Sequence, residues 1–179
     1  MAIRETISVN EMNQEIDLAE IYGREPTREE LSEFAELARD EVISRTQSGE
    51  KRGGGKFQQY SEKYAEFKGS NDVDLTLFGD MLDAVDAGVN GSSVNIFIND
   101  ELETKKGYNH HVGDTLPERP WFGLTEKEAR DLAGQVKRVI EEPGLIEAIG
   151  SASLFQEFNG GLDSQSISEI LVNIGLFND

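Results

Sequence analysis

The segment between Lys105 and Thr125 constrains the fold of this chain more than any other part of the sequence. It contains both histidines, the only tryptophan and two of the four prolines. Proline fixes its own φ and biases the preceding residue toward extended backbone, which predicts a stiff extended connector over residues 116–120. The connector would hold two aromatic side chains and a cation at defined positions. We therefore interpret five residues as structural anchors: Pro117, Arg119, Pro120, Trp121 and Phe122.

Helix start signals follow the connector and also occur much earlier in the chain. Thr125 and Glu128 form a capping box, in which each side chain can bond the backbone N–H of the other residue. Thr27 and Glu30 repeat this pattern, and apolar residues follow both boxes at helical spacing. These patterns predict two long amphipathic helices, of which the first ends at Gly49.

A strand pattern lies in the middle of the chain, where residues 94–98 carry an aliphatic side chain at every second position. The preceding pair Asn90-Gly91 is favoured in type I′ hairpin turns. We therefore expect a hairpin in which residues 80–89 pair with residues 92–99, although the apolar spacing of the first arm would also suit a helical turn.

Together these elements predict an α+β fold, with a small antiparallel sheet and β-hairpin packed against two long amphipathic helices, plus N- and C-terminal extensions. The core domain is expected at residues 24–142. Residues 1–23 would form an N-terminal arm with a strand or extended segment and a short helix. Residues 143–179 form an acidic extension without Lys or Arg, with a short helix over residues 166–174. Its aromatic side chains would dock on another surface, in the same subunit or a neighbour: Phe155, Phe158 and Phe177.

Two further stretches have competing interpretations. Residues 49–56, GEKRGGGK, lack the Ser or Thr that follows Lys in a phosphate-binding loop, so a mobile linker is favoured over a phosphate cradle. The next stretch has aromatic residues at spacings of three and four, which would place them on one helical face. A stripe facing the core is favoured over a nucleic-acid stacking platform for these residues: Phe57, Tyr60, Tyr64 and Phe67.

Candidate catalytic and metal-binding residues are few. The chain has no cysteine, which removes thiolate nucleophiles and zinc–cysteine sites. His110 and His111 are adjacent in a predicted helix over residues 101–112, where their side chains would point about 100° apart and could not share one ion. A helix end at the surface is the favoured interpretation. We therefore expect no catalytic, cofactor-binding or metal-binding residues, and a protein that is not an enzyme.

The charge of the chain argues against two further classes. There are 35 acidic and 17 basic side chains, giving a formal net charge of −18. A sequence-reading DNA binder needs a basic footprint, and an anionic membrane surface attracts basic segments. No window approaches the roughly 20 apolar residues of a membrane-spanning helix. We therefore expect a soluble protein without a membrane partner.

Four stretches of the chain carry a resemblance to a known family when taken in their order along the sequence: residues 41–49 (EVISRTQSG), 57–68 (FQQYSEKYAEFK), 74–82 (DLTLFGDML), and 110–113 (HHVG) followed by 116–125 (LPERPWFGLT). In this order they resemble the phage virion morphogenesis family, the Mu G-like tail-completion proteins and their head-to-tail connector relatives. The resemblance covers about residues 25–140. In that family the matching segments recur as scaffold.

The resemblance implies a structural virion protein of the phage neck, located at the head–tail junction and assembled in the host cytoplasm. It would form a homo-oligomeric ring, hexameric or dodecameric, that completes the tail or joins head to tail. Its partners would be neighbouring neck, portal or tail-tube proteins. DNA would pass through the lumen without sequence-specific binding, helped by acidic walls that repel phosphate. Arg119 would pair with a carboxylate, within the subunit or across the ring.

Other functions remain open at this point. A portal-bound connector or adaptor is a close variant of the neck ring. An acidic interaction module, such as a DNA-mimicking inhibitor of a host nuclease, belongs to a different class and also suits the negative charge. A hydrolase built from carboxylates would need a pocket in which two acids have different pKa values.

Overall fold

This computed structural model describes most of the chain, namely residues 2–75, 80–113 and 116–141. The chain divides into two units, Met1–Lys137 and Arg138–Asp179, and only the first few residues of the second unit are described. The expected C-terminal extension and its short helix lie outside the described residues. The same holds for the three aromatic residues assigned to docking: Phe155, Phe158 and Phe177.

Four strands form one antiparallel sheet in the order β1-β2-β4-β3. They are β1 (Ile3–Ile7), β2 (Met12–Asp17), β3 (Val85–Asn90) and β4 (Ser93–Ile98). The two central strands bury side chains at alternate positions, as expected for a sheet with one covered face: Met12, Gln14, Ile16, Val94, Ile96 and Ile98. The predicted α+β class with a small antiparallel sheet is confirmed.

Residues 1–23, expected as an N-terminal arm, supply two strands of this sheet and helix α1 (Leu18–Tyr22). Strand β2 lies between β1 and β4, so that Ile16 is paired with Ile3 on one side and Val94 on the other. The segment joins the sheet instead of forming an arm because Ile16 and Leu18 are then completely removed from solvent. Strand β4 is far away in sequence, so local periodicity does not reveal this pairing.

The predicted hairpin forms between β3 and β4 with a shorter first arm. The residues before β3 form the helical turn α4 (Asp80–Asp83) instead of a strand. Asn90 pairs with Ser93, so the turn residues are Gly91 and Ser92. Gly91 has φ +61°, whereas φ at Ser92 is not positive. This combination is typical of a type II′ turn, and it corrects the predicted type I′ turn.

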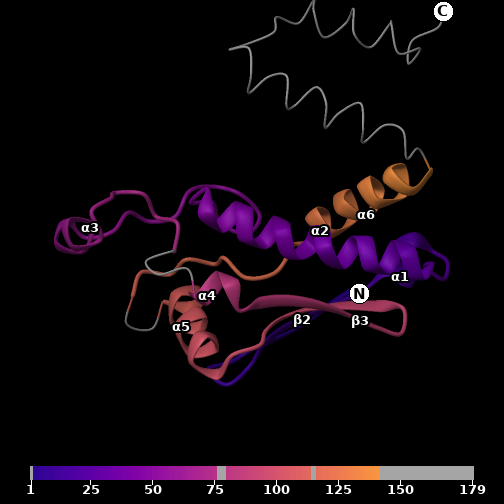
Figure 1. Cartoon of the computed structure of the whole chain (residues 1–179), viewed down its shortest axis with the longest axis horizontal. Coiled ribbons are helices and arrows are strands. Elements are labelled where there is room, and N and C mark those ends of the chain that lie inside the picture. Colours follow the sequence, from indigo (N-terminus) through magenta and orange to yellow (C-terminus); the bar gives the residue numbers. More distant parts are fainter. Residues whose placement is uncertain (1, 76–79, 114–115, 142–179) are drawn as a thin grey trace, which may run out of the picture. The chain divides into compact units, whose positions relative to one another are not determined.

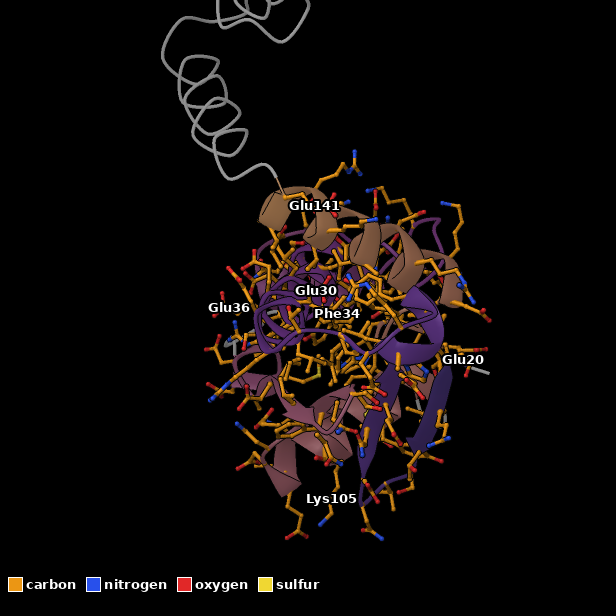
Figure 2. All side chains as sticks on the ribbon, turned by 90° about the vertical axis from the view of Figure 1, so that its right-hand side faces the viewer. Glu20, Glu30, Phe34, Glu36, Lys105 and Glu141 are labelled. Atoms are coloured by element: carbon orange, nitrogen blue, oxygen red, sulfur yellow. The ribbon has the colours of Figure 1, made fainter. Side chains whose placement is uncertain are left out.

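Helix α2 (Arg28–Gln47) contacts β3 and β4 and lies along the covered face of the sheet (Figure 1). Its Phe34 side chain is fully buried and points into the interior (Figure 2). Three further helices are α3 (Glu62–Lys68), α5 (Glu101–Val112) and α6 (Glu126–Glu141). Helix α5 has the predicted bounds and ends at Gly113, where φ is +73°.

The start of α2 is expected to weaken at low pH. Both hydrogen bonds of the Thr27 and Glu30 capping box are present, and Arg24 donates two more to the Glu30 carboxylate. The bonds from Arg24, together with the Thr27 N–H, lower the pKa of Glu30 from 4.5 to about 2. Glu30 therefore stabilises the fold above its unfolded pKa. This contribution, about 2 to 3 kcal/mol, is lost as the pH falls toward the folded pKa.

Urea unfolding across the acid range measures this effect. The Glu30→Gln variant should show a flatter pH dependence than the wild type. Glu29→Gln replaces an exposed carboxylate in the same helical turn and serves as the control. Parallel curves for the wild type and Glu30→Gln would contradict the prediction.

Candidate functional site

The proline-containing segment predicted from the sequence continues to Leu124, and residues 116–124 are called the connector below; Leu116 and Glu118 are exposed, whereas residues 121–124 lie in the core. Trp121 and Phe122 are fully buried, and their rings meet edge to face with centroids 5.6 Å apart. The Trp121 indole N–H donates to the Gly107 carbonyl of α5 at 3.0 Å. A Cβ atom at Gly107 would lie 2.9 Å from the Trp121 ring, so the close approach of α5 depends on this glycine. Both aromatic residues are therefore anchors of the core.

Arg119 is only 2% exposed and stands between the half-buried Pro117 and Pro120. Its Nε and Nη2 atoms donate to the Gln58 carbonyl at 3.2 and 3.1 Å, and Nη1 donates to the Pro117 carbonyl at 3.4 Å. The guanidinium carbon also lies 5.0 Å from the centre of the Tyr60 ring. The predicted carboxylate partner is thus replaced, within the described part of the chain, by carbonyl groups and an aromatic face. Burial leaves no accessible surface for a carboxylate from another subunit.

Arg45, near the end of α2, holds the connector from the helix side. Its Nη2 atom donates to the carbonyls of Trp121 and Gly123 at 2.8 and 2.7 Å, and Nη1 lies 3.1 Å from a Glu128 carboxylate oxygen. Arg45 is not among the residues predicted from the sequence. Arg45 lies three residues after the buried Val42, on the same face of the helix. An arginine on a buried face requires buried hydrogen-bond partners, and this position is the sequence feature that could have identified it.

Gln14 holds the connector from the sheet side. Its fully buried side chain accepts a hydrogen bond from the Leu124 N–H and donates one to the Leu124 carbonyl, both at 2.8 Å. The side-chain amide thus acts as a backbone-like partner for the connector. Gly123 permits the approach, because it has φ +77° and a Cβ there would lie 2.8 Å from the Gln14 amide. No sequence pattern pointed to Gln14.

Glu128 connects the capping box of α6 to the rest of the core. One carboxylate oxygen accepts from the Thr125 N–H at 2.6 Å, and the Thr125 hydroxyl accepts from the Glu128 N–H at 3.2 Å, which confirms the predicted box. The other oxygen accepts from Arg45 and from the Gly53 N–H, each at 3.1 Å. A single carboxylate therefore joins α2, α6 and the glycine-rich loop.

The glycine-rich loop, residues 49–56, is docked on the connector, which corrects the mobile-linker interpretation. Its Arg52 N–H donates to the Pro120 carbonyl at 2.8 Å, and the Arg52 guanidinium donates to the Leu124 carbonyl at 2.8 Å and pairs with Glu5. Inside the loop, Lys51 N–H donates to the Gly55 carbonyl at 2.7 Å. Side-chain and backbone bonds to distant segments outweigh the local flexibility of glycine here.

The aromatic residues after this loop do not form one helical stripe. Phe57 is buried but lies before α3, and Phe67 is 73% exposed. Tyr60 and Tyr64 meet edge to face with ring centres 4.7 Å apart, and the cations of Arg119 and Lys68 lie 5.0 and 5.1 Å from the centre of the Tyr60 ring. The predicted stripe on one helical face is therefore wrong, because Phe57 and Tyr60 precede the helix, which begins at Glu62, and Phe67 within the helix is exposed.

The two histidines lie beneath the connector rather than at an open helix end. The His110 carbonyl accepts from the Arg119 N–H at 2.8 Å, and His111 Nδ1 accepts from the Phe122 N–H at 3.3 Å. Burial, together with the nearby Arg119 guanidinium, lowers the pKa of His110 to about 4. His110 Nδ1 is buried without a hydrogen-bond partner among the described residues. Its role is therefore one of packing.

Replacing His110 by leucine is expected to remove a pH-sensitive loss of stability. Burial disfavours the charged imidazolium, so the folded pKa of His110, about 4, is lower than its ordinary value of 6.5, and the wild type keeps its full stability above pH 6.5, where His110 is neutral in both states. About 2 to 3 kcal/mol should be lost as the pH falls through this range in the wild type. His110→Leu should match the wild type at neutral pH and lose less stability on acidification.

Chemical denaturation between neutral pH and about pH 4 provides the measurement. His111→Leu serves as the contrast, because it also removes the acceptor of the Phe122 N–H. That variant should already lose about 1 kcal/mol at neutral pH. An acid-induced loss in His110→Leu equal to that of the wild type would show that His110 does not carry the effect.

The interactions of these residues are hydrogen bonds, ion pairs and packing contacts within the fold. In the described ranges, no three His, Asp or Glu side chains gather closely enough to hold a metal ion. A hollow of about 380 Å³ lies between the end of α2 and residues 56–73, but its Lys56 is already bonded to the Ser48 carbonyl and to Glu50. None of the helices in the described part is both long and apolar enough to cross a membrane.

Comparison of the chain with family models, with curated proteins and with solved structures found no match. The fold and the contacts around the connector are therefore the observations on which a function can be argued.

Proposed function

We propose that this protein is a non-enzymatic structural component of the phage neck, which forms a ring that completes the tail or joins head to tail. One observation carries the proposal. Among the four sequence segments that resemble the virion morphogenesis family, the first and second contact the connector in the fourth, and the third contacts the second. Arg45 comes from the first segment, Tyr60 from the second and Leu75 from the third, and Arg119 lies in the fourth. In this arrangement the shared residues build a scaffold.

The contacts between these segments support that interpretation. Arg45 bonds the connector carbonyls, Arg119 bonds the Gln58 carbonyl, and the Leu75 N–H donates to the Tyr60 hydroxyl at 3.3 Å. Each contact joins two of the four segments. Catalytic residues would instead converge on an open pocket with free acids or bases. We assign the two long amphipathic helices of the proposed fold to α2 and α6, which the Arg45 and Glu128 ion pair links.

In the proposed ring, the acidic C-terminal segment holds a neighbouring subunit through Phe155, Phe158 and Phe177. Neighbouring neck, portal or tail-tube proteins bind the two faces of the ring, and DNA passes through the lumen. The net charge of −18 suits a lumen that repels phosphate. The protein is then located in the virion, at the junction of head and tail.

The oligomeric state of the full chain tests the proposal. Native mass spectrometry and sedimentation should detect a hexamer or dodecamer, and labelled protein should appear at the neck in images of particles. A triple variant, Phe155→Ser with Phe158→Ser and Phe177→Ser, should dissociate the ring without lowering the urea midpoint. Phe67→Ser removes an aromatic side chain that is 73% exposed, and it should leave the ring intact.

Two results would replace this proposal with another. A monomer at every concentration that does not join heads to tails would exclude the ring. A tight stoichiometric complex with a basic nuclease, lost when acidic residues are neutralised, would favour the DNA-mimicking inhibitor. A ring that binds the portal and not the tail would favour the connector or adaptor.

A further inference from the structure

Strand β1 is an edge of the sheet, and among the described residues no strand pairs with its outer side. In an antiparallel pair, residues alternate between those bonded to the partner strand and those whose N–H and C=O point away. Ser8 and Glu11 exchange two backbone hydrogen bonds at the turn between β1 and β2, and the Asp17 N–H donates to the Ala2 carbonyl. The alternation therefore points the backbone groups outward at three positions of β1: Ile3, Glu5 and Ile7. No described hydrogen bond uses those groups.

The opposite edge, β3, is partly blocked. There the same alternation points the backbone groups of Val85, Ala87 and Val89 outward, because Asn90 and Ser93 form the pair next to the turn. The Val85 carbonyl accepts from Arg39 Nε at 3.0 Å, and the Ala87 N–H donates to the Asp86 carboxylate at 2.8 Å. Side chains occupy two of these edge groups, so β1 is the better site for an added strand.

A hollow of about 360 Å³ adjoins β1 and is lined by Ile3, Glu5, Arg52 and Glu126. It contains two carboxylates and one guanidinium. Glu5 Oε1 accepts from Gln14 and also pairs with Arg52, whereas Glu5 Oε2 accepts no hydrogen bond from the described residues. The hollow can hold side chains of an added strand next to the Glu5 Oε2 atom, which can accept a further hydrogen bond.

We propose that β1 binds an extended segment of another protein with the pattern apolar-x-Lys/Arg-x-apolar. The strand would pair with the outward backbone groups of β1, as in recognition by β-strand addition. Its central cation would lie opposite Glu5, and its apolar side chains would lie opposite Ile3 and Ile7. Opposite charges and apolar pairs directly across two strands are stabilising. This inference does not depend on the neck function.

The chain itself does not offer a suitable occupant. A second copy of β1 would bring Glu5 opposite Glu5 in the centred antiparallel register, and like charges in that position are destabilising. Residues 143–179 contain no Lys or Arg. The stretch Val136–Ile140 has the required spacing around Arg138, but it belongs to helix α6. Charge complementarity therefore favours a segment from a different protein.

Peptide binding to the full-length, isotope-labelled protein tests the proposal. The probe is the heptapeptide Thr-Val-Thr-Lys-Thr-Val-Thr with blocked ends, and the matched peptide has Glu in place of Lys. The Lys peptide should slow hydrogen exchange of the Ile3, Glu5 and Ile7 amides by about tenfold or more at saturation. It should bind about fivefold more tightly than the Glu peptide, as expected for exchanging an opposite for a like charge across two strands.

Two edge variants locate the binding site. Ile7→Pro removes an outward N–H and should abolish protection of β1, because the added strand loses a donor. The variant should still fold, since proline is tolerated where the N–H is unpaired. Val89→Pro removes an outward N–H from the β3 edge and should bind the Lys peptide like the wild type. Unaltered binding by a folded Ile7→Pro variant, or protection at β3 instead of β1, would overturn the proposal.

A charge-reversal variant tests the specificity without removing an N–H. Glu5→Lys should reverse the preference, so that the Glu peptide binds more tightly than the Lys peptide. Equal affinities for both peptides, in the wild type and in this variant, would exclude the charge-selective pairing. Self-association of the wild type that is lost in Ile7→Pro would show that the occupant is a second copy, and this result would also overturn the proposal.

Discussion

Replacing Arg45 by leucine is expected to lower the free energy of unfolding by about 3 to 5 kcal/mol. The Arg45 side chain is 5% exposed and bonds the carbonyls of Trp121 and Gly123 as well as Glu128. Leucine fills part of the volume but leaves two buried carbonyls without donors. It also leaves Glu128 without its cation. Removing one member of a buried network costs more than the network contributes in total, because the remaining groups stay desolvated.

Urea unfolding of the full chain at neutral pH provides the measurement, through the midpoint and slope of the transition. Arg28→Leu is the matched control, because Arg28 is an exposed residue of the same helix. It should change the stability by less than about 0.5 kcal/mol. A loss in Arg45→Leu no larger than that of the control would show that the connector does not depend on Arg45.

Replacing Gly113 by alanine is expected to be the most damaging of the glycine substitutions at helix ends. Gly113 has φ +73°, and a Cβ there would lie 2.6 Å from the backbone nitrogen of Glu118 and 2.7 Å from its Cα. Backbone atoms cannot rotate away, so the connector would have to move. We expect a loss of about 3 to 4 kcal/mol, combining the cost of positive φ for alanine with overpacking.

Gly69 supplies an unusually close control for this substitution. It caps α3 as Gly113 caps α5, with φ +76°, but nothing lies within 4 Å of the position that a Cβ atom would take there. Gly69→Ala should therefore lose only about 1 to 2 kcal/mol, the conformational cost alone. The difference between the two urea midpoints measures the contact with Glu118. Equal losses of stability in the two variants would show that the connector moves away from the added Cβ atom at no cost in free energy.

Several local features could be predicted from the sequence. Both capping boxes form as expected, because each depends on two residues three positions apart and on the backbone between them. Helix α5 begins after Asp100, whose side chain accepts from the Leu102 and Glu103 N–H groups, and ends at Gly113. Such features are decided within one helical turn, so local sequence is sufficient to predict them.

The contacts of the candidate site were only partly predictable. The prolines mark the segment whose predicted anchors Arg119, Trp121 and Phe122 are buried. The partners of Arg119 were predicted wrongly, because the preference of arginine for carboxylates is a tendency of the residue type. In the folded protein, the carbonyl of Gln58 and the ring of Tyr60 are the groups brought within reach.

The sequence by itself determined the positions of the two capping boxes and the site of the hairpin. The tertiary structure alone decided that residues 1–23 join the sheet, that the glycine-rich loop docks, and that Gln14 and Arg45 hold the connector from opposite sides. The physical reason is the range of the interactions. Caps and turns satisfy backbone groups of neighbouring residues, whereas buried polar side chains take whichever distant partner the packed fold places within hydrogen-bonding distance.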